Sequence, residues 1–135
     1  MDKICLDNNG LSYFWSKIKT YIDNVITTFT NSYWPFGTSV NLEGSVIDLT
    51  FGDVFLKTIT ADTTFTFRGV PAGRTATFSI ILTNGGQYTI TWPSSVKWSY
   101  NSAPLLTSSG IDVLTFLTPD GGTTWYGSLS SCDAS

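Results

Sequence analysis

Side chains able to do chemistry are scarce in this chain of 135 residues, and their types narrow what that chemistry could be. Histidine, the commonest general base in enzymes and a frequent metal ligand, does not occur. The serines therefore have no histidine partner with which a nucleophilic triad could be built. We expect no hydrolase or transferase activity and assign no catalytic residue.

Carboxylates are the remaining candidates for acid–base chemistry or for metal binding. In principle two of them could act as the paired acid and base of a glycosidase. Asp in or beside a turn more often accepts hydrogen bonds from nearby backbone, so we favour that structural interpretation. Loop carboxylates could also hold Ca²⁺, but the D-x-D-x-D-G spacing of a calcium loop is absent. We expect no metal and no other cofactor. The carboxylates in question are Asp48, Asp53, Asp62, Asp112 and Asp120.

Aromatic residues make up 15% of the chain, and five of them could stack on sugar rings at a binding site: Trp92, Trp98, Tyr100, Trp125 and Tyr126. Alternation along residues 88–92 places Trp92 on a strand face that most simply turns toward the core. We assign Trp92 and Trp125 to the core, because large aromatic side chains dominate the interiors of β domains. Trp98 and Tyr100 lie in or beside a loop-like stretch, and they are our candidate glycan contacts.

The elements that must position these residues change in character near Trp34-Pro35. Before that point, apolar side chains recur at steps of four and three residues, which is the a/d spacing of a heptad. This spacing predicts a helix of about 20 residues, or roughly 30 Å. Asn8 or Asn9 could cap its start, and the Thr- and Ser-rich stretch 27–32 should weaken its end. The spaced residues, the seam, are Leu11, Trp15, Ile18, Ile22, Val25 and Phe29.

Two interpretations of the seam remain open. The helix could lie against the chain's own β domain, since Phe14, Tyr21 and Ile26 make the apolar surface wider than a strict seam. Alternatively it could associate with copies of itself, which we favour narrowly on spacing alone. Ile at both seam positions disfavours dimers and indicates three or more helices, whereas Trp15 is large for a tight seam.

Composition restricts the partners. A net charge of -3 argues against nucleic-acid binding, which needs a basic face. Charged residues amount to only 13%, and together with the many aromatics this favours a surface partly buried between chains.

The ends of the chain give weaker indications. Cys5 and Cys132 have no neighbouring ligand for zinc, and a disulfide would require the two ends to meet. Residues 1–10 lack the apolar segment of a signal peptide, and no run approaches the 18 apolar residues of a membrane span. We expect a soluble protein made in the cytoplasm, without membrane insertion.

From Val40 onward, turn residues separate short runs of β-branched and aromatic residues, which predicts an antiparallel β-sandwich or jelly roll rather than a parallel sheet. Asn84-Gly85-Gly86 fits a tight hairpin between the strands on either side of it. We therefore divide the chain into an oligomerising or anchoring helix at 1–34 and a β-sandwich domain at 35–135. The predicted strands are 46–50, 54–60, 63–67, 75–83, 88–92, 96–98, 111–118 and 124–129.

The order of several short motifs resembles a β domain that recurs at the C-termini of phage tail-fibre and other virion-surface proteins. The resemblance covers roughly Ser45 to Gly127, and the segment from Leu6 to Lys19 is similar to N-terminal helices of phage and prophage structural proteins. The motifs are Gly52-Asp53-Val54-Phe55, Thr63-Thr64-Phe65-Thr66-Phe67, Phe78-Ser79-Ile80-Ile81-Leu82, Gly86-Gln87-Tyr88-Thr89-Ile90-Thr91-Trp92-Pro93, Val96-Lys97-Trp98, Ala103-Pro104, Asp112-Val113-Leu114-Thr115-Phe116 and Asp120-Gly121-Gly122-Thr123-Thr124-Trp125-Tyr126-Gly127.

This resemblance implies a viral structural protein that forms a homotrimer, and it strengthens the coiled-coil interpretation of the seam. The sequence shows neither a shaft of repeats nor a large particle-binding domain, which favours a short head fibre, a capsid decoration protein or a small tail-tip component. Its expected location is the virion, after assembly in the host cytoplasm. Its expected partners are other capsid or tail proteins and, as a candidate, a host-surface glycan. The alternative is a carbohydrate-binding β-sandwich module of a cellular protein.

Overall fold

The computed structural model of the chain describes residues 8–33 and 37–134, with residues 29–33 described by their backbone alone. The chain divides into two compact units, Met1–Phe36 and Gly37–Ser135, and each is considered by itself. The protein is mainly β, with one N-terminal helix. Within the described residues, no helix combines the length and the apolar character that crossing a membrane requires.

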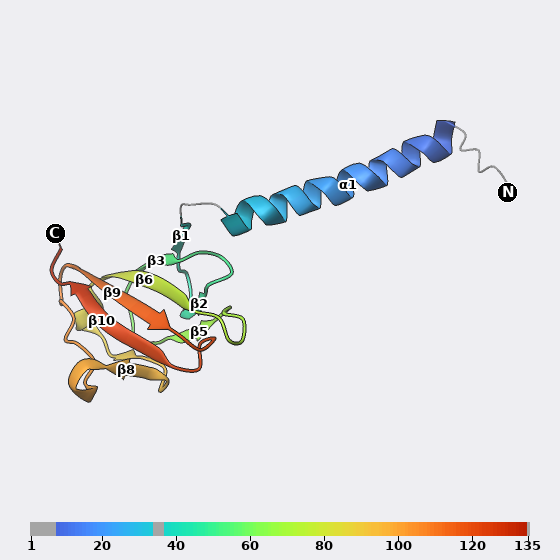
Figure 1. The fold of residues 1–135 in the computed structure, drawn as a ribbon. Helices are drawn as coiled ribbons and strands as arrows, with labels where there is room; N and C mark the ends of the chain where they lie inside the picture. Colours follow the sequence, from blue (N-terminus) through green and yellow to red (C-terminus); the bar gives the residue numbers. More distant parts are fainter. Residues whose placement is uncertain (1–7, 34–36, 135) are drawn as a thin grey trace. The chain divides into compact units, whose positions relative to one another are not determined.

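The first unit contains a single helix, α1 (Asn8–Tyr33), of 26 residues (Figure 1). It begins at one of the two asparagines expected near its start and is longer than predicted, because it continues through the Thr-rich stretch. Thr27 Oγ1 donates to the carbonyl oxygen of Asp23 at 2.8 Å, and Thr20 Oγ1 donates to that of Ser16 at 2.9 Å. These threonine hydroxyls are therefore satisfied within the helix and do not compete with its backbone bonds.

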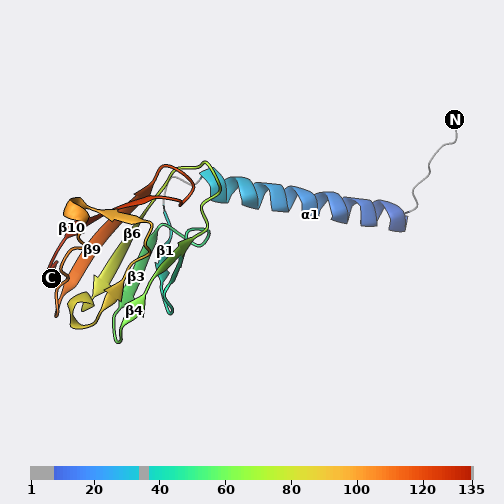
Figure 2. The ribbon, with the colours of Figure 1, turned by 90° about the horizontal axis from the view of Figure 1, so that it is seen from below.

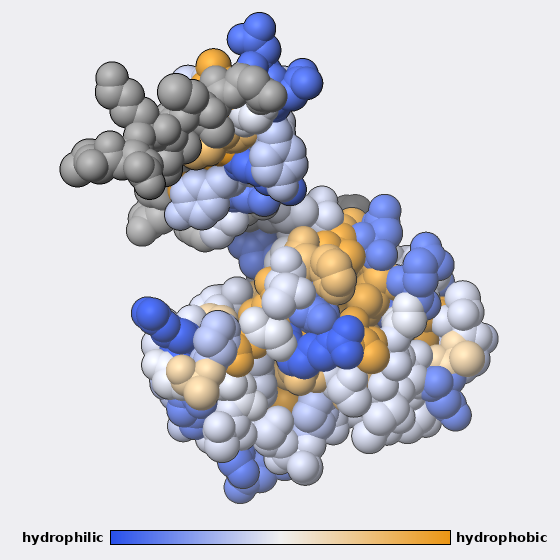
Figure 3. All heavy atoms as spheres, turned by 90° about the vertical axis from the view of Figure 1, so that its right-hand side faces the viewer, coloured by the Kyte–Doolittle hydropathy of each residue, from blue (hydrophilic) through white to orange (hydrophobic). Residues whose placement is uncertain are grey.

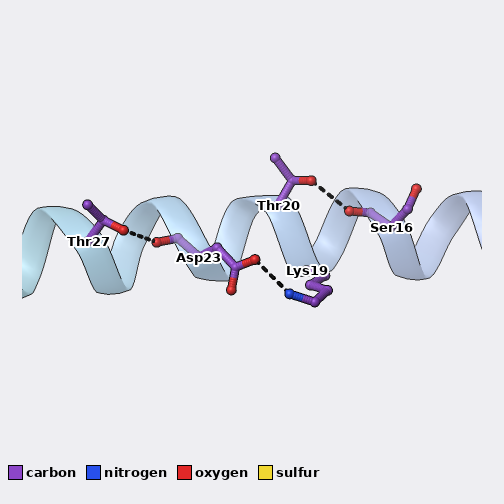
Figure 4. A network of polar contacts seen from close by, with 5 residues as sticks. All are labelled: Ser16, Lys19, Thr20, Asp23 and Thr27. Atoms are coloured by element: carbon purple, nitrogen blue, oxygen red, sulfur yellow. Dashed lines mark hydrogen bonds and ion pairs between the residues drawn. The ribbon is translucent and has the colours of Figure 1, made fainter.

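One side of α1 carries this polar network, which Figure 4 shows together with an ion pair. Lys19 Nζ lies 2.9 Å from Asp23 Oδ2, one helical turn away. At 100° per residue, these polar residues fall on a different side of the helix from the predicted seam. The helix is therefore amphipathic, with the polar network and the apolar seam on separate sides.

The second unit is built from ten strands and two 3₁₀ turns, and its strand bounds lie close to the predicted ones. Two differences stand out: β1 was not predicted, and the single strand predicted at 63–67 is divided into β4 and β5, which pair with different strands. The elements are β1 (Ser39–Asn41), β2 (Val46–Asp48), β3 (Val54–Thr58), β4 (Thr63–Thr64), β5 (Thr66–Arg68), β6 (Ala76–Thr83), η1 (Gly85–Gln87), β7 (Ile90–Thr91), β8 (Val96–Trp98), η2 (Ser99–Asn101), β9 (Ile111–Thr118) and β10 (Trp125–Ser131).

Six strands form one sheet in the order β1-β3-β6-β9-β10-β8, while β2 pairs with β5 and β4 pairs with β7. The long strands β6, β9 and β10 lie side by side and antiparallel (Figures 1 and 2). The pairs β1–β3, β3–β6, β8–β10, β2–β5 and β4–β7 are parallel. The prediction of an antiparallel arrangement was therefore wrong in this respect, because the sheet is mixed.

The predicted hairpin at Asn84-Gly85-Gly86 was also wrong. The segment forms η1, and the strands on either side of it do not pair, since β6 lies between β3 and β9 and β7 pairs with β4. Asn84 adopts a left-handed conformation with φ 60°. A side chain at position 86 would collide with the carbonyl oxygen of Leu106. Glycine is thus required there by close approach to a distant loop rather than by a two-residue turn.

The core lies between the six-stranded sheet and the two short strand pairs. Phe67 on β5 contacts three aromatic rings of the sheet, those of Phe78, Phe116 and Trp125, with centroids 4.9 to 5.3 Å apart. Ile47 on β2 is fully buried in the same cluster. Edge-to-face aromatic contacts of this kind add to the stabilisation that comes from area burial. On the side that Figure 3 shows, the surface of this unit is mostly white and blue, with orange spheres gathered in a limited patch.

Candidate functional site

The first unit, considered by itself, leaves most of the seam of α1 uncovered. Leu11, Ile22 and Val25 are exposed, and Trp15 is 60% exposed. Ile18 is half-buried. The side chain of Phe29 lies outside the described residues. The helix by itself does not cover this apolar side, and leaving side chains of this size in water is costly unless other protein surface covers them.

The seam is flanked by further exposed apolar and aromatic side chains, so the uncovered surface is broader than two heptad positions. Leucine, valine and isoleucine in the seam supply aliphatic surface, while two of the flanking residues supply aromatic rings. A strip of this breadth suits packing against more than one neighbouring helix. The flanking residues are Phe14, Tyr21 and Ile26.

Each of the five carboxylates considered as acid–base groups accepts a backbone N–H. Asp53 Oδ1 accepts the N–H of Thr38 at 2.9 Å, which ties the start of β1 to the start of β3. Asp62 Oδ1 accepts the N–H of Thr89 at 2.8 Å, beside the β4–β7 pair. These bonds connect segments far apart in sequence, so they hold loops in place, and neither carboxylate is paired with a second one.

Asp48 and Asp120 make local bonds that stabilise turns. The pKa of Asp48 lies below its ordinary value of 3.8, because the hydroxyl and backbone N–H of Thr50 donate to Oδ1 and the Arg68 guanidinium donates to Oδ2 at 2.7 Å. The pKa of Asp120 is also lowered, chiefly by the N–H of Thr124 at 2.8 Å. Hydrogen bonds to the charged form have this effect on a carboxyl group.

Asp112 is the one acidic side chain that is fully buried among the described residues. Its oxygens accept the N–H of Thr107 at 2.6 Å, the hydroxyl of Thr107 at 2.7 Å and the N–H of Asp133 at 3.2 Å. Three donors compensate for the loss of hydration that burial imposes on a carboxylate. Asp112 therefore fastens the segment before β9 and the chain after β10 to the sheet.

The aromatic residues assigned to the core do lie there. Trp125 is 1% exposed, and Trp92 packs against the core and stacks on Phe65 with ring centroids 5.0 Å apart. The two candidate glycan contacts differ from each other. Trp98 packs against Trp92 and Phe116, with centroids 5.6 and 5.5 Å away.

Tyr100 is fully exposed and, like Asn101, has a left-handed backbone, with φ 57°. It follows Trp98 closely in sequence, but the two rings have different surroundings. Trp98 is held by the core, and Tyr100 stands in solvent. The structure therefore does not bring them together as one stacking platform, although it leaves Tyr100 accessible.

Two further exposed residues lie on neighbouring strands of the β unit: Leu117, which sequence reasoning missed, and Tyr126, which it named only among the aromatics able to stack on sugar rings. Both belong to strands that alternate between buried and exposed positions, and each follows a buried aromatic, Phe116 or Trp125. Alternation along these strands would have predicted that both side chains point away from the core.

No group of three or more Cys, Asp or Glu side chains able to hold a metal ion occurs among the described residues. Cys132 is an exposed free thiol, and Cys5 lies outside the described residues. Comparison with protein-family models, with curated proteins and with solved structures found no match to this chain.

Proposed function

We propose that this chain is a non-enzymatic structural protein of a phage virion, a short surface fibre or decoration protein located as a head fibre or tail-tip component. In this role three copies associate through α1, and the β units are displayed for contact with a host surface, including its glycans. The observation that carries the proposal is the exposed apolar seam of α1, which a second and third copy would cover.

The seam favours self-association because its spacing is that of a helical bundle. Trp15, Ile22 and their neighbours lie on one stripe of the helix, separated from the Lys19–Asp23 pair. A heptad stripe with Ile at both positions fits three or more strands better than two. We therefore propose a parallel trimeric coiled coil for α1, attached to particle proteins of the capsid or tail.

The β unit supports the display role. Its core is closed by aromatic contacts, and each of the five carboxylates described above accepts a backbone N–H. We propose that the six-stranded sheet and the two strand pairs facing it constitute a β-sandwich of jelly-roll type. Such a unit is rigid and offers loops and sheet faces for recognition.

The connection between the two units supports a joint assembly. Only residues 34–38 stand between the end of α1 and the start of β1, and such a segment spans no more than about 20 Å. When the helices associate, tethers this short keep neighbouring β units close to one another. Repeated copies at high effective concentration then multiply any weak surface contact.

The proposal is tested first on the purified full chain. Light scattering should give the mass of three chains over a wide concentration range. A monomer whose mass does not change with concentration would remove the basis of the proposal. A map of the intact particle would then locate the chain on the head or on the tail.

The competing function is that of a carbohydrate-binding module of a cellular protein, favoured by the exposed aromatic and polar residues of the β unit. Such a module would bind its sugar as a single copy. Binding by a monomeric protein, together with the absence of this chain from purified particles, would favour the module over the virion component.

A further inference from the structure

The six-stranded sheet has an outer face, defined as the side opposite the core, and its β8 edge carries an unusual row of side chains. Strand register places Lys97 on β8 beside Tyr126 on β10, and Tyr126 beside Leu117 on β9. All three side chains are exposed, Tyr126 to 54% and Leu117 to 47%. Since residues directly opposite in neighbouring strands share one face, a cation, a phenol ring and an aliphatic group lie in line.

A second row, one step along the same strands, is made of hydroxyl groups. Ser128 on β10 lies beside Thr115 on β9. Thr115 Oγ1 is 2.8 Å from the hydroxyl of Ser130 and 3.2 Å from that of Ser79. The hydroxyls of the sheet face thus form a connected network with capacity for further hydrogen bonds.

Between the two rows lies a shallow hollow of about 480 Å³. Gly127 lies between the two rows, but its position faces the core, where an added Cβ would collide with Trp98 and press on Phe116. A volume of this size is in the range of small-ligand sites. The hollow is lined by Lys97, Trp98, Ser99, Thr115, Leu117, Tyr126, Gly127 and Ser128.

The charge that lines the hollow is positive and comes from Lys97. None of its lining residues is acidic. Among the described residues, Lys97 forms no ion pair, whereas Arg68 and Lys19 each bind an aspartate. Lys57 is also occupied, since its ammonium group lies 3.2 Å from the carbonyl oxygen of Glu43. An ammonium group next to an exposed ring and several hydroxyls is therefore left for an external anion.

We infer that this hollow binds an acidic saccharide, and the inference rests on the display role proposed above for the β unit. The Tyr126 ring would stack on the apolar face of a sugar ring. The Lys97 ammonium group would bind the sugar carboxylate, and the hydroxyls of Ser99, Ser128 and Thr115 would exchange hydrogen bonds with sugar hydroxyls. A neutral sugar would use the ring and the hydroxyls but not Lys97.

The residues of the hollow fit a sugar better than the loop aromatics do. Tyr100 is fully exposed, and Trp98 turns its ring to the core. Tyr126, in contrast, is flanked on both sides by neighbouring strands whose side chains can close around a bound ring. The inference therefore moves the expected contact from the loop after β8 to the sheet face beside it.

The test measures binding of oligogalacturonate to the full chain by calorimetry, with its methyl-esterified, uncharged form as the matched ligand. We expect the acidic form to bind more tightly, and this preference to decrease as salt is added. Tyr126→Ala should weaken binding of both forms by about tenfold, as expected for a central aromatic contact. Lys97→Met keeps the aliphatic stem and should abolish the preference for the acidic form.

Tyr100→Ala is the matched control, since it removes a still more exposed tyrosine outside the hollow, and it should leave the affinity unchanged. If Tyr100→Ala removes binding and Tyr126→Ala does not, the site is the loop and the inference is overturned. Absence of binding by either form also overturns it.

Light scattering on the same variants separates this inference from the proposed assembly. If Tyr126→Ala reduces the mass of the assembly that the purified chain forms in solution, the outer face is a contact between copies and not a saccharide site. If the wild-type chain proves monomeric but still prefers the acidic ligand in a Lys97-dependent way, the hollow stands and the proposed trimer fails.

Discussion

The two units of this protein differ in how far they bury their largest apolar side chains. In the β unit the largest are enclosed, with Trp125 and Phe78 each 1% exposed. In α1 they point outward, with Trp15 at 60% and Tyr21 at 71%. Burial of apolar surface is the main favourable term in folding, so the β unit closes its own core while the helix depends on surface from elsewhere. Under the proposed function, assembly and folding are therefore assigned to separate parts of the chain.

The largest effect is expected when charged residues are placed in the seam. Replacing Ile18 and Ile22 with Asp in every copy should dissociate the assembly, because buried unpaired charges cost several kcal/mol each. Light scattering should then give the mass of one chain, while near-UV circular dichroism of the aromatic core stays unchanged. Loss of the near-UV signal would show that the helix belongs to the β core, and a persistent trimer would show that the β units hold the assembly.

The reciprocal change is Phe78→Ala in the β unit. Phe78 contacts Phe55, Phe67, Phe116 and Trp125, so its removal leaves a cavity between the sheet and the facing strands. We expect a loss of about 3–5 kcal/mol in the free energy of unfolding of the β unit, measured by urea denaturation. The helical signal and the mass of the assembly should be unaffected at low urea. A decrease in the mass of the assembly in this variant would contradict the separation of the two units.

A smaller effect is expected for Asp112→Asn, which replaces one acceptor oxygen of a buried carboxylate with an amide donor. One of the donors on Thr107 or Asp133 then loses its partner, at a cost of about 1–3 kcal/mol. Urea denaturation measures it, and Asp62→Asn at an exposed carboxylate is the control, with an expected change below about 0.5 kcal/mol. Equal effects in the two variants would mean that burial of Asp112 carries no special cost.

The smallest effect concerns pH. The pKa values of Asp48 and Asp120 lie below 3.8 in the folded chain, so the unfolded chain binds protons first as the pH falls. The stability that these groups contribute is therefore present above about pH 4 and is lost as the pH falls through their folded pKa values. Thermal melts of the wild type should show this decline, and the variant with Asp48→Asn and Asp120→Asn should show a shallower one. An identical decline in both proteins would assign the pH dependence to other groups.

Local patterns predicted much of this fold. Heptad spacing located α1, and runs of β-branched and aromatic residues between turns located most strands, since both depend on neighbours in sequence. Strand partners were not predictable in the same way. Val54 pairs with Ser79 and Trp125 pairs with Val96, and both pairs are parallel. Parallel partners are joined by long connections, so no turn between them records the pairing.

The candidate site residues also divide into those that a local sequence pattern predicts and those that depend on strand pairing. The seam could be read from spacing because helical residues three and four apart share a face. The row of Lys97, Tyr126 and Leu117 could not, because it exists only once β8, β10 and β9 are placed in register. Trp98 and Tyr100 are two residues apart in the sequence, yet Trp98 packs against the core and Tyr100 does not. Proximity along a loop does not fix the direction of a side chain.

The first strand of the β unit gives the chain a mechanical property. Tension that arrives through the helix meets β1, which is joined in parallel to β3 and reinforced where Thr38 donates to Asp53 Oδ1 and accepts the N–H of Asp53 at 3.1 Å. Directly after the other end of β1, the backbone N–H of Leu42 donates to the carbonyl oxygen of Leu56 at 2.9 Å. A pull must therefore break a set of hydrogen bonds at this edge before it reaches the aromatic core. The edge therefore acts as a clamp that keeps the load away from the aromatic core.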